Sequence, residues 1–139
     1  MEKSKVVSTK RAPEPVGAYP HARIANGFVF LSGVGPRKPG TRDIPGVHQD
    51  AQGRVLSYDI EVQTESVIEN IKIILEEAGS SFEKIVDVQV FLTDMKKDFK
   101  AYNQVYAKHF TAIQATRTTI EIGALPTPIA VEFKVIALA

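Results

Sequence analysis

Apolar runs and polar breaks first mark out a hairpin in the N-terminal third of the chain. Residues 27–32, GFVFLS, form an apolar run bounded by glycines, which predicts a buried strand. A partner strand is expected at residues 21–25, because Asn26 and Gly27 between the two segments are the pair that a tight hairpin turn favours.

The following residues, 33–58, lack such a pattern and are rich in Gly, Pro, Asp and Gln. This composition predicts a long loop without regular structure. Loops of that length in compact domains often serve as lids or binding loops, but a tolerated surface insertion explains the segment equally well.

Two later segments repeat apolar residues at helical spacing. In residues 59–80, DIEVQTESVIENIKIILEEAGS, Asp59 is suited to cap the start of a helix and Gly79 to end it in a left-handed conformation. The apolar stripe of this helix is Ile60, Val67, Ile71, Ile74 and Leu75. Residues 94–110, DMKKDFKAYNQVYAKHF, predict a second helix with the stripe Phe99, Tyr102, Val105, Tyr106 and Phe110.

Three further segments have the period of strands. Residues 84–95, KIVDVQVFLTDM, alternate Ile85, Asp87 and Gln89 with Val86, Val88 and Val90. That alternation predicts a strand with one wet face. Two final strands are predicted at about residues 117–123 and 130–137, joined by a turn.

The order of these elements predicts an α+β fold. The order is two or three strands, a helix, a strand, a helix and two strands. Such an order suits a mixed sheet with both helices on one face. The other face then needs cover, and self-association into a cyclic homo-oligomer is a common solution.

Composition places the chain among globular proteins of one domain, residues 1–139. Its 139 residues allow one sizeable core, and 44% hydrophobic with 24% charged residues argues against disorder. The net charge is +1 without a basic run, which argues against a nucleic-acid partner. No apolar run approaches the ~18 residues of a membrane span, and the N-terminus lacks the apolar core of a signal peptide. We therefore expect a cytoplasmic protein without a membrane partner.

Metal and thiol chemistry find no support in the sequence. The chain has no cysteine, which excludes disulfides, thiolate metal sites and a cysteine nucleophile. Its histidines, His21, His48 and His109, follow no metal-binding spacing. No bound metal is expected.

Two charged residues in the last two strands are the candidate chemistry. Period two places Arg117 and Thr119 on one face, and if the two strands pair, Glu132 points to the same side. The planar fork of an arginine suits a carboxylate ligand, and a half-buried glutamate suits proton transfer because burial raises its pKa. The pattern alone favours a plainer interpretation, a cross-strand ion pair on a solvated face.

The motifs RTTIEIGALP and VEFKVIA, with VGAYPHA and FLSGVGP nearer the start, resemble the Rid (YjgF) family of imine and enamine deaminases. The similarity runs from about Pro15 to Ala137. Within the family, the long loop with DAQG and YDIE, and the stretch ALPTPIAVEFKVIA, are most similar to the 2-aminomuconate deaminases. The resemblance implies a chorismate-mutase-like fold, a homotrimer with clefts between subunits, and no cofactor; a hexamer stays open.

The resemblance also implies roles for individual residues. Arg117 matches the carboxylate-binding arginine, and Glu132 matches the acid–base glutamate that positions water. Tyr19 matches an early pocket tyrosine, and Gly33 matches a glycine whose backbone neighbours the substrate. Thr119 stands where the family often has cysteine, so a hydroxyl replaces a thiol.

The reaction that the resemblance implies is hydrolysis of 2-aminomuconate to 4-oxalocrotonate and ammonia, in aromatic catabolism. Arg117 would hold one carboxylate of this dicarboxylate enamine, and Glu132 would activate the water that attacks C2 of its imine form. The second carboxylate needs another cation. The candidates are Arg37, Lys38 and Arg42 in the long loop, and His21 beside Tyr19.

Two alternative functions remain open. One is a general deaminase of imines of the 2-aminoacrylate type. The other is a non-enzymatic trimer that only binds small acids. The expected juxtaposition of Glu132 with Arg117 favours an enzyme, because a carboxylate does not help to hold an anion.

Overall fold

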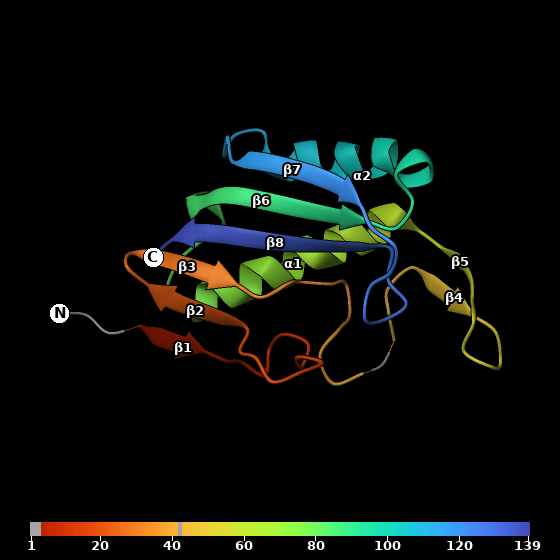
Figure 1. Ribbon diagram of the computed structural model, residues 1–139, viewed down its shortest axis with the longest axis horizontal. Coiled ribbons are helices and arrows are strands. Elements are labelled where there is room, and N and C mark those ends of the chain that lie inside the picture. The colour runs from red at the N-terminus through yellow and green to blue at the C-terminus, as the bar shows by residue number, and fades with distance from the viewer. Residues whose placement is uncertain (1–3, 42) are drawn as a thin grey trace.

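The computed structural model describes residues 4–41 and 43–139 and folds them into two helices packed on one face of a mixed sheet (Figure 1). The sheet has six strands in the order β1-β2-β3-β8-β6-β7, in which only β6 and β7 run parallel. The elements are β1 (Lys5–Val7), β2 (Ala22–Ala25), β3 (Phe28–Leu31), β4 (Val47–Gln49), β5 (Val55–Tyr58), α1 (Ile60–Glu77), a 3-10 turn (Phe82–Lys84), β6 (Ile85–Leu92), α2 (Met95–Phe110), β7 (Thr116–Glu121) and β8 (Val131–Leu138). The predicted α+β architecture is confirmed.

The predicted N-terminal hairpin is confirmed as β2 and β3. Asn26 and Gly27 both take positive φ, at 52° and 83°, as a tight turn between twisted strands requires. The strand after the turn is only half buried, however. Its residues alternate, with Val29 and Leu31 in the core and Phe28 and Phe30 on the outer face.

Both helices begin and end as their sequences predict. The side chain of Asp59 accepts from the backbone N–H groups of the first turn of α1, and Gly79 follows the helix with a φ of 78°. The side chain of Asp94 accepts in the same way from Lys97 N at the start of α2. The buried faces of the two helices form one core with the inner face of the sheet.

The last two strands do not pair, so the condition under which the sequence places Arg117 and Glu132 on one face is not met. β6 lies between β7 and β8, pairing in parallel with β7 and antiparallel with β8. The physical reason is the helix between β6 and β7, because a strand–helix–strand crossover returns the chain parallel to the strand it left. The bulge between Ile85 and Asp87 in β6 also turns Ile85 into the core, so its predicted alternation fails at that end.

The segment predicted as a structureless loop is largely ordered. Its second half is the hairpin of β4 and β5, which projects from the end of the sheet (Figure 1). Its first half is tied to α1, where the side-chain amide of Asn70 donates to the carbonyls of Gly35 and Arg37 at 2.9 and 2.8 Å. Ser66 Oγ donates to the carbonyl between them, Pro36 O, at 2.7 Å.

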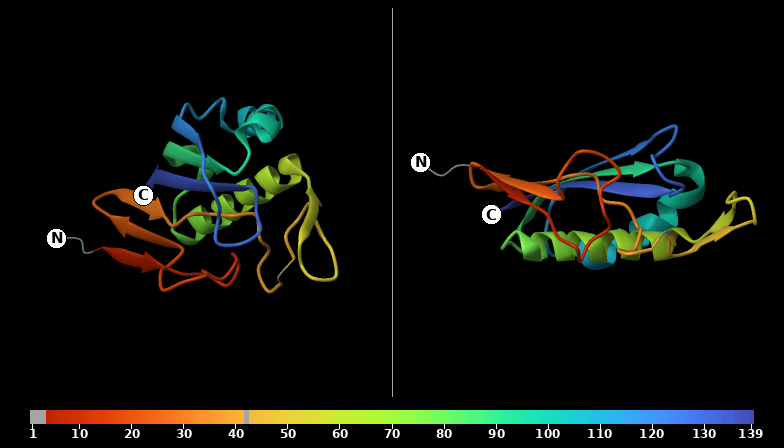
Figure 2. Two further views of the ribbon diagram at one scale, coloured as in Figure 1. Left: turned by 45° about the vertical axis from the view of Figure 1, so that its right-hand side comes forward. Right: turned by 90° about the horizontal axis from the view of Figure 1, so that it is seen from below.

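The face of the sheet opposite the helices, hereafter the open face, carries exposed apolar side chains. No helix of the described residues covers it (Figure 2). Phe28 and Leu138 face each other across β3 and β8, with 36% and 47% of their surfaces exposed. The other large apolar residues exposed on this face of the described sheet are Val6 on β1, Phe30 on β3, Val86 on β6 and Ile120 on β7. Self-association through this face stays a prediction. None of the described helices is both long and apolar enough to span a bilayer.

Candidate functional site between the sheet faces

Glu132 lies on the open face of β8 against the backbone of Gly33. A side chain at Gly33 would collide with it, because its Cβ would lie 2.5 Å from Glu132 Oε2 and 2.9 Å from Cδ. The carboxylate is half-buried, and this burial raises the pKa of Glu132 above its ordinary value. A carboxyl group in such surroundings is suited to exchange protons near neutral pH.

Arg117 lies on the inner face of β7 and packs against α2. Its guanidinium is 4.6 Å from the ring centroid of Tyr106 and 5.6 Å from that of Tyr102, and Nη1 donates to Asn103 Oδ1 at 2.7 Å. None of the ion pairs among the described residues involves Arg117. The cation is thus held in place by aromatic rings and one amide, and no carboxylate of the described residues forms an ion pair with it.

The structure places Arg117 and Glu132 on opposite faces of the sheet, and the expectation that they share a face is wrong. Arg117 is in register with Val88, which is fully buried on the inner face. Glu132 is in register with Phe91, which is in turn in register with Ile120 on the open face. Residues directly opposite each other in neighbouring strands point to the same side.

Thr119 shares the inner face with Arg117, as predicted. Its Oγ1 lies 2.9 Å from the hydroxyl of Tyr102 on α2, and Tyr102 is fully buried. This hydrogen bond fixes the tyrosine ring beside the guanidinium of Arg117. The threonine therefore positions the aromatic support of Arg117.

The predicted pocket residues Tyr19, His21 and Gly33 do come together. They line one hollow at the end of β2 and β3, together with Ser32 and Arg37. Tyr19 is 43% exposed, and its hydroxyl accepts from Val16 N at 3.3 Å. The tyrosine ring is thus available to a ligand in this hollow.

His21 is in the hollow wall but is not free to bind a substrate carboxylate. Its Nε2 lies 2.8 Å from Pro13 O, and its Nδ1 accepts from Thr9 N at 3.2 Å. Both ring nitrogens are therefore taken up by the N-terminal segment, and only 8% of the residue is exposed. The expectation that His21 supplies a distal cation does not agree with these contacts.

The loop cations differ in how the structure places them. Arg37 Nη2 donates to Glu14 O at 2.8 Å at the edge of the hollow. Lys38 lies beside it in a neighbouring surface depression. Arg42 lies outside the described residues. Of the two described loop cations, Arg37 is thus the one that lines the hollow together with Gly33.

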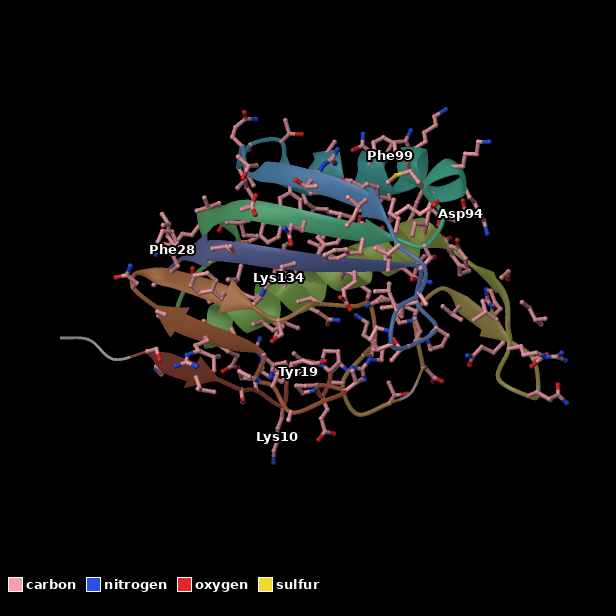
Figure 3. The ribbon with its side chains drawn as sticks, in the orientation of Figure 1. Lys10, Tyr19, Phe28, Asp94, Phe99 and Lys134 are labelled. Carbon is pink, nitrogen blue, oxygen red and sulfur yellow. The ribbon has the colours of Figure 1, made fainter. Side chains whose placement is uncertain are left out.

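The sequence interpretation gave no role to Lys134, which shares the open face with Glu132. Its Nζ donates to the carbonyl of Leu31 at the end of β3, and burial lowers the pKa of this amine. In Figure 3 Lys134 lies between β8 and the end of β3. The available signal was the period of two along β8, which places residues 132 and 134 on one face.

No group of His, Asp and Glu residues in the described part of the chain is arranged to hold a metal ion. The chemistry that the described residues offer is that of one guanidinium, one carboxyl group of raised pKa and one amine of lowered pKa.

Comparison with known proteins gives consistent matches over nearly the whole chain. Residues 9–139 match a family model described as Endoribonuclease L-PSP. A RutC family protein of Pyrococcus abyssi is 38% identical over 132 residues, covering 95% of this chain and 94% of that protein. Reactive Intermediate Deaminase A, chloroplastic, of Arabidopsis thaliana is 38% identical over 135 residues, covering 97% of this chain and 66% of that protein.

A solved structure shares the fold as well. That of E. coli TdcF with bound serine is similar with a TM-score of 0.81 and 33% sequence identity, covering 97% of this chain and 98% of that chain.

Proposed function

The chain belongs to the Endoribonuclease L-PSP (Rid) family, and from that premise we propose that it is a hydrolytic deaminase of small imine and enamine acids. The observation that carries the proposal is Glu132, a half-buried carboxyl group of raised pKa held against Gly33. The name of the relative from Arabidopsis thaliana, Reactive Intermediate Deaminase A, supports the same class of reaction.

The active site of this proposal lies between subunits. Within one subunit the juxtaposition that favoured an enzyme over a binding protein is missing, because Arg117 and Glu132 occupy opposite faces. However, β7 is the edge strand of the sheet, so a neighbouring subunit can approach Arg117 past that edge. If the neighbour presents its open face there, its Glu132 meets this subunit's Arg117. In a cyclic homotrimer every subunit makes this contact once with its β7 edge and once with its open face, so neither surface stays without a partner.

The proposed mechanism needs one cation and one acid–base group. Arg117 binds the carboxylate of the substrate through two parallel hydrogen bonds and so fixes the neighbouring imine carbon. Glu132 takes a proton from a water molecule as that water attacks the imine carbon. The same carboxyl group returns that proton to the substrate nitrogen, which gives a carbinolamine. It then moves the proton of the new hydroxyl group to the same nitrogen, so that the C–N bond breaks and ammonia and a 2-oxo acid result.

The relatives support a general deaminase better than a dedicated 2-aminomuconate deaminase. The substrates of this proposal are therefore imines of the 2-aminoacrylate type. The 2-aminomuconate specificity and its place in aromatic catabolism stay predictions of the sequence. Arg37, at the edge of the hollow beside Gly33, is the described loop cation best placed to bind a second carboxylate.

The experiment that tests the function is an ammonia-release assay with the purified protein. The substrates are 2-aminoacrylate generated in situ, 2-aminomuconate, and RNA as a control for the family description. We expect ammonia above the spontaneous rate from 2-aminoacrylate. A protein that binds small carboxylic acids but releases no ammonia would instead be the binding trimer.

A further inference from the structure

The guanidinium of Arg117 lies against a single stripe of α2. Three members of the stripe are aromatic, and their ring centroids lie 6.0 Å (Phe99), 5.6 Å (Tyr102) and 4.6 Å (Tyr106) from the central carbon of the guanidinium. The fourth member is Asn103, whose Oδ1 accepts from Arg117 Nη1 at 2.7 Å. Positions 99, 102, 103 and 106 have helical spacing, so they share one side of α2. Asn103 is thus the one amide in an otherwise aromatic stripe.

Asn103 offers the arginine an acceptor that carries no charge. A guanidinium can only donate hydrogen bonds, so the oxygen of the amide, and not its nitrogen, must face Arg117. Because the donor is charged, this bond is stronger than one between two neutral groups, and it restricts the orientation of the guanidinium. The amide leaves the positive charge of Arg117 uncompensated, and that charge stays available to an anion.

The carboxylate on the neighbouring strand β6 is engaged elsewhere. Asp87 is in register with Thr116, the residue before Arg117 in β7, and its Oδ1 accepts from Thr116 Oγ1 at 2.6 Å. No ion pair among the residues that the structure describes involves Arg117. Within the described part of the chain, the cation is therefore fixed in place but not neutralised.

We propose that Asn103 is a positioning residue of the site, whose neutral amide holds the guanidinium of Arg117 while leaving its charge to the carboxylate of the substrate. The proposal rests on the deaminase function proposed above and deepens it, because it names the contact that makes the site select acids. Asn103 acts through Arg117 and does not touch the reacting atoms. The aromatic rings of the stripe have the same effect, since their faces attract a cation without supplying an anion.

A purely structural amide is the rival interpretation. In that case the bond between Arg117 and Asn103 only ties β7 to α2. The substitution Asn103→Asp distinguishes the two roles, because it keeps the size of the side chain and the accepting oxygen but adds a negative charge. A structural residue tolerates this change without an effect on ligands. For a positioning residue, the added charge pairs with the guanidinium and competes with the carboxylate of the ligand.

The test is the binding of pyruvate, measured by isothermal titration calorimetry. Pyruvate is the 2-oxo acid that hydrolysis of 2-aminoacrylate yields, so it carries the carboxylate that Arg117 is proposed to bind. Asn103→Asp should raise the Kd of pyruvate by roughly 10- to 100-fold, the scale of one hydrogen bond to a charged group. The Tm of this variant should not fall below that of wild type, because its bond to Arg117 is charged on both sides. A structural role does not predict lost binding with retained stability.

Kinetics give a second measurement on the same variant. In the ammonia-release assay with 2-aminoacrylate, kcat/KM of Asn103→Asp should fall by a similar factor. The change should lie mainly in KM, because Asn103 acts on the binding of the carboxylate and not on the proton transfers of Glu132.

Asn103→Ala removes the acceptor without adding a charge. The ligand must then order the guanidinium itself, which should raise the Kd of pyruvate by roughly 2- to 10-fold, the scale of immobilising one flexible side chain. This effect is smaller than that of Asn103→Asp. The alanine variant also decides the question if the aspartate variant does not fold.

The matched control is Gln104→Glu. Gln104 is the next residue of α2 and is exposed, so the substitution adds the same charge to the same helix away from Arg117. It should bind pyruvate as wild type does. An equal loss of binding in Gln104→Glu would assign the effect to the charge of the helix and overturn the role of Asn103. Size-exclusion chromatography compares the oligomeric state of every variant with that of wild type.

Each result decides between specific claims. Wild-type affinity for pyruvate in either folded variant of Asn103 would overturn its positioning role and leave the deaminase function standing. A wild-type protein that does not bind pyruvate would overturn the carboxylate site at Arg117 and the role of Asn103 with it. If no imine yields ammonia, the deaminase function fails. The expected losses of pyruvate binding would then still establish the role of Asn103, in a protein that only binds small acids.

Discussion

The carboxylate of Glu132 occupies the space that a side chain at Gly33 would fill, since a Cβ there would lie 2.5 Å from Glu132 Oε2. The glycine is therefore required by its neighbour. Its φ is not in the left-handed region, so its role is to leave room for a carboxylate rather than to allow a turn.

Gly33→Ala should consequently displace Glu132 and reduce deaminase activity while leaving the fold intact. A displacement of about 1 Å at a catalytic group can cost about 100-fold in rate, and we expect a loss of kcat on that scale. The measurement is the rate of ammonia release together with circular dichroism. Gly123→Ala is the matched control, because a Cβ at Gly123 meets nothing within 4 Å. Equal activity of Gly33→Ala and wild type would show that the position of Glu132 does not matter.

Arg117→Ala should weaken substrate binding, because in this proposal the guanidinium binds the carboxylate of the substrate through hydrogen bonds. A hydrogen bond to a charged group contributes about 1.5–3 kcal/mol, so kcat/KM should fall by roughly 10- to 100-fold, mainly through KM. The control is Arg54→Ala in the β4–β5 hairpin, where the exposed arginine pairs with Asp50. Unchanged kcat/KM on a carboxylate substrate would remove Arg117 from the site.

A mixture of variants tests whether the site spans two subunits. Subunits with Arg117→Ala and subunits with Glu132→Gln are each expected to be inactive. When they are unfolded together and refolded, random assembly gives roughly one intact site in four if each site takes its two groups from different subunits. Recovery of activity in the mixture, measured against each variant refolded alone, supports the interface site. No recovery, with mixed oligomers verified by native mass spectrometry, would place both groups in one subunit.

Glu132→Gln should abolish most turnover yet stabilise the protein at neutral pH. General acid–base catalysis contributes about 10²- to 10⁴-fold, which sets the expected loss of kcat. Burial raises the pKa of Glu132 above its ordinary value of 4.5, so between these two pKa values the folded state binds more protons than the unfolded state. The contribution of Glu132 to the stability of the wild-type protein therefore falls as pH rises from 4.5 through the pKa of Glu132 in the folded state, and then stays constant.

The measurement is Tm against pH for both proteins. The advantage in Tm of Glu132→Gln over wild type should be smallest below pH 4.5, where Glu132 is protonated in both states, and should grow toward neutral pH. A difference in Tm that is independent of pH would contradict the raised pKa.

Tyr58→Phe should destabilise the fold, because Tyr58 anchors the β4–β5 hairpin to α2. Its hydroxyl donates to Asp98 Oδ2 at 2.6 Å, and Asp98 is only 2% exposed. Removing the donor leaves a buried carboxyl group without its partner, which costs about 1–3 kcal/mol in the free energy of unfolding. Chemical denaturation gives this value directly.

The matched control is Tyr106→Phe. The hydroxyl of Tyr106 is buried and has no hydrogen-bond partner among the described residues, so its removal should not lower the free energy of unfolding. A loss of stability equal to that of Tyr58→Phe would show that the loss of a buried hydroxyl, and not of the hydrogen bond to Asp98 in particular, lowers the free energy of unfolding.

Local sequence determined both helices and the longer strands of this fold, but not the β4–β5 hairpin. The turn at Asn26 and Gly27, the cap at Asp59 and the apolar stripes of both helices each depend on neighbours a few residues away, and each agrees with the structure. The residue types at positions 117 and 132 also identified the chemistry, because a guanidinium and a carboxyl group have fixed capabilities wherever the chain places them.

Tertiary structure alone decided which of these groups face one another. Period two fixes the faces within one strand, but the relative phase of two strands depends on the strand between them and on its register. The insertion of β6 between β7 and β8 therefore put Arg117 and Glu132 on opposite sides, and the pairing of Val34 with Phe133 brought Gly33 against Glu132. Both features arise from pairing between residues far apart in the chain, and no local pattern carries that information.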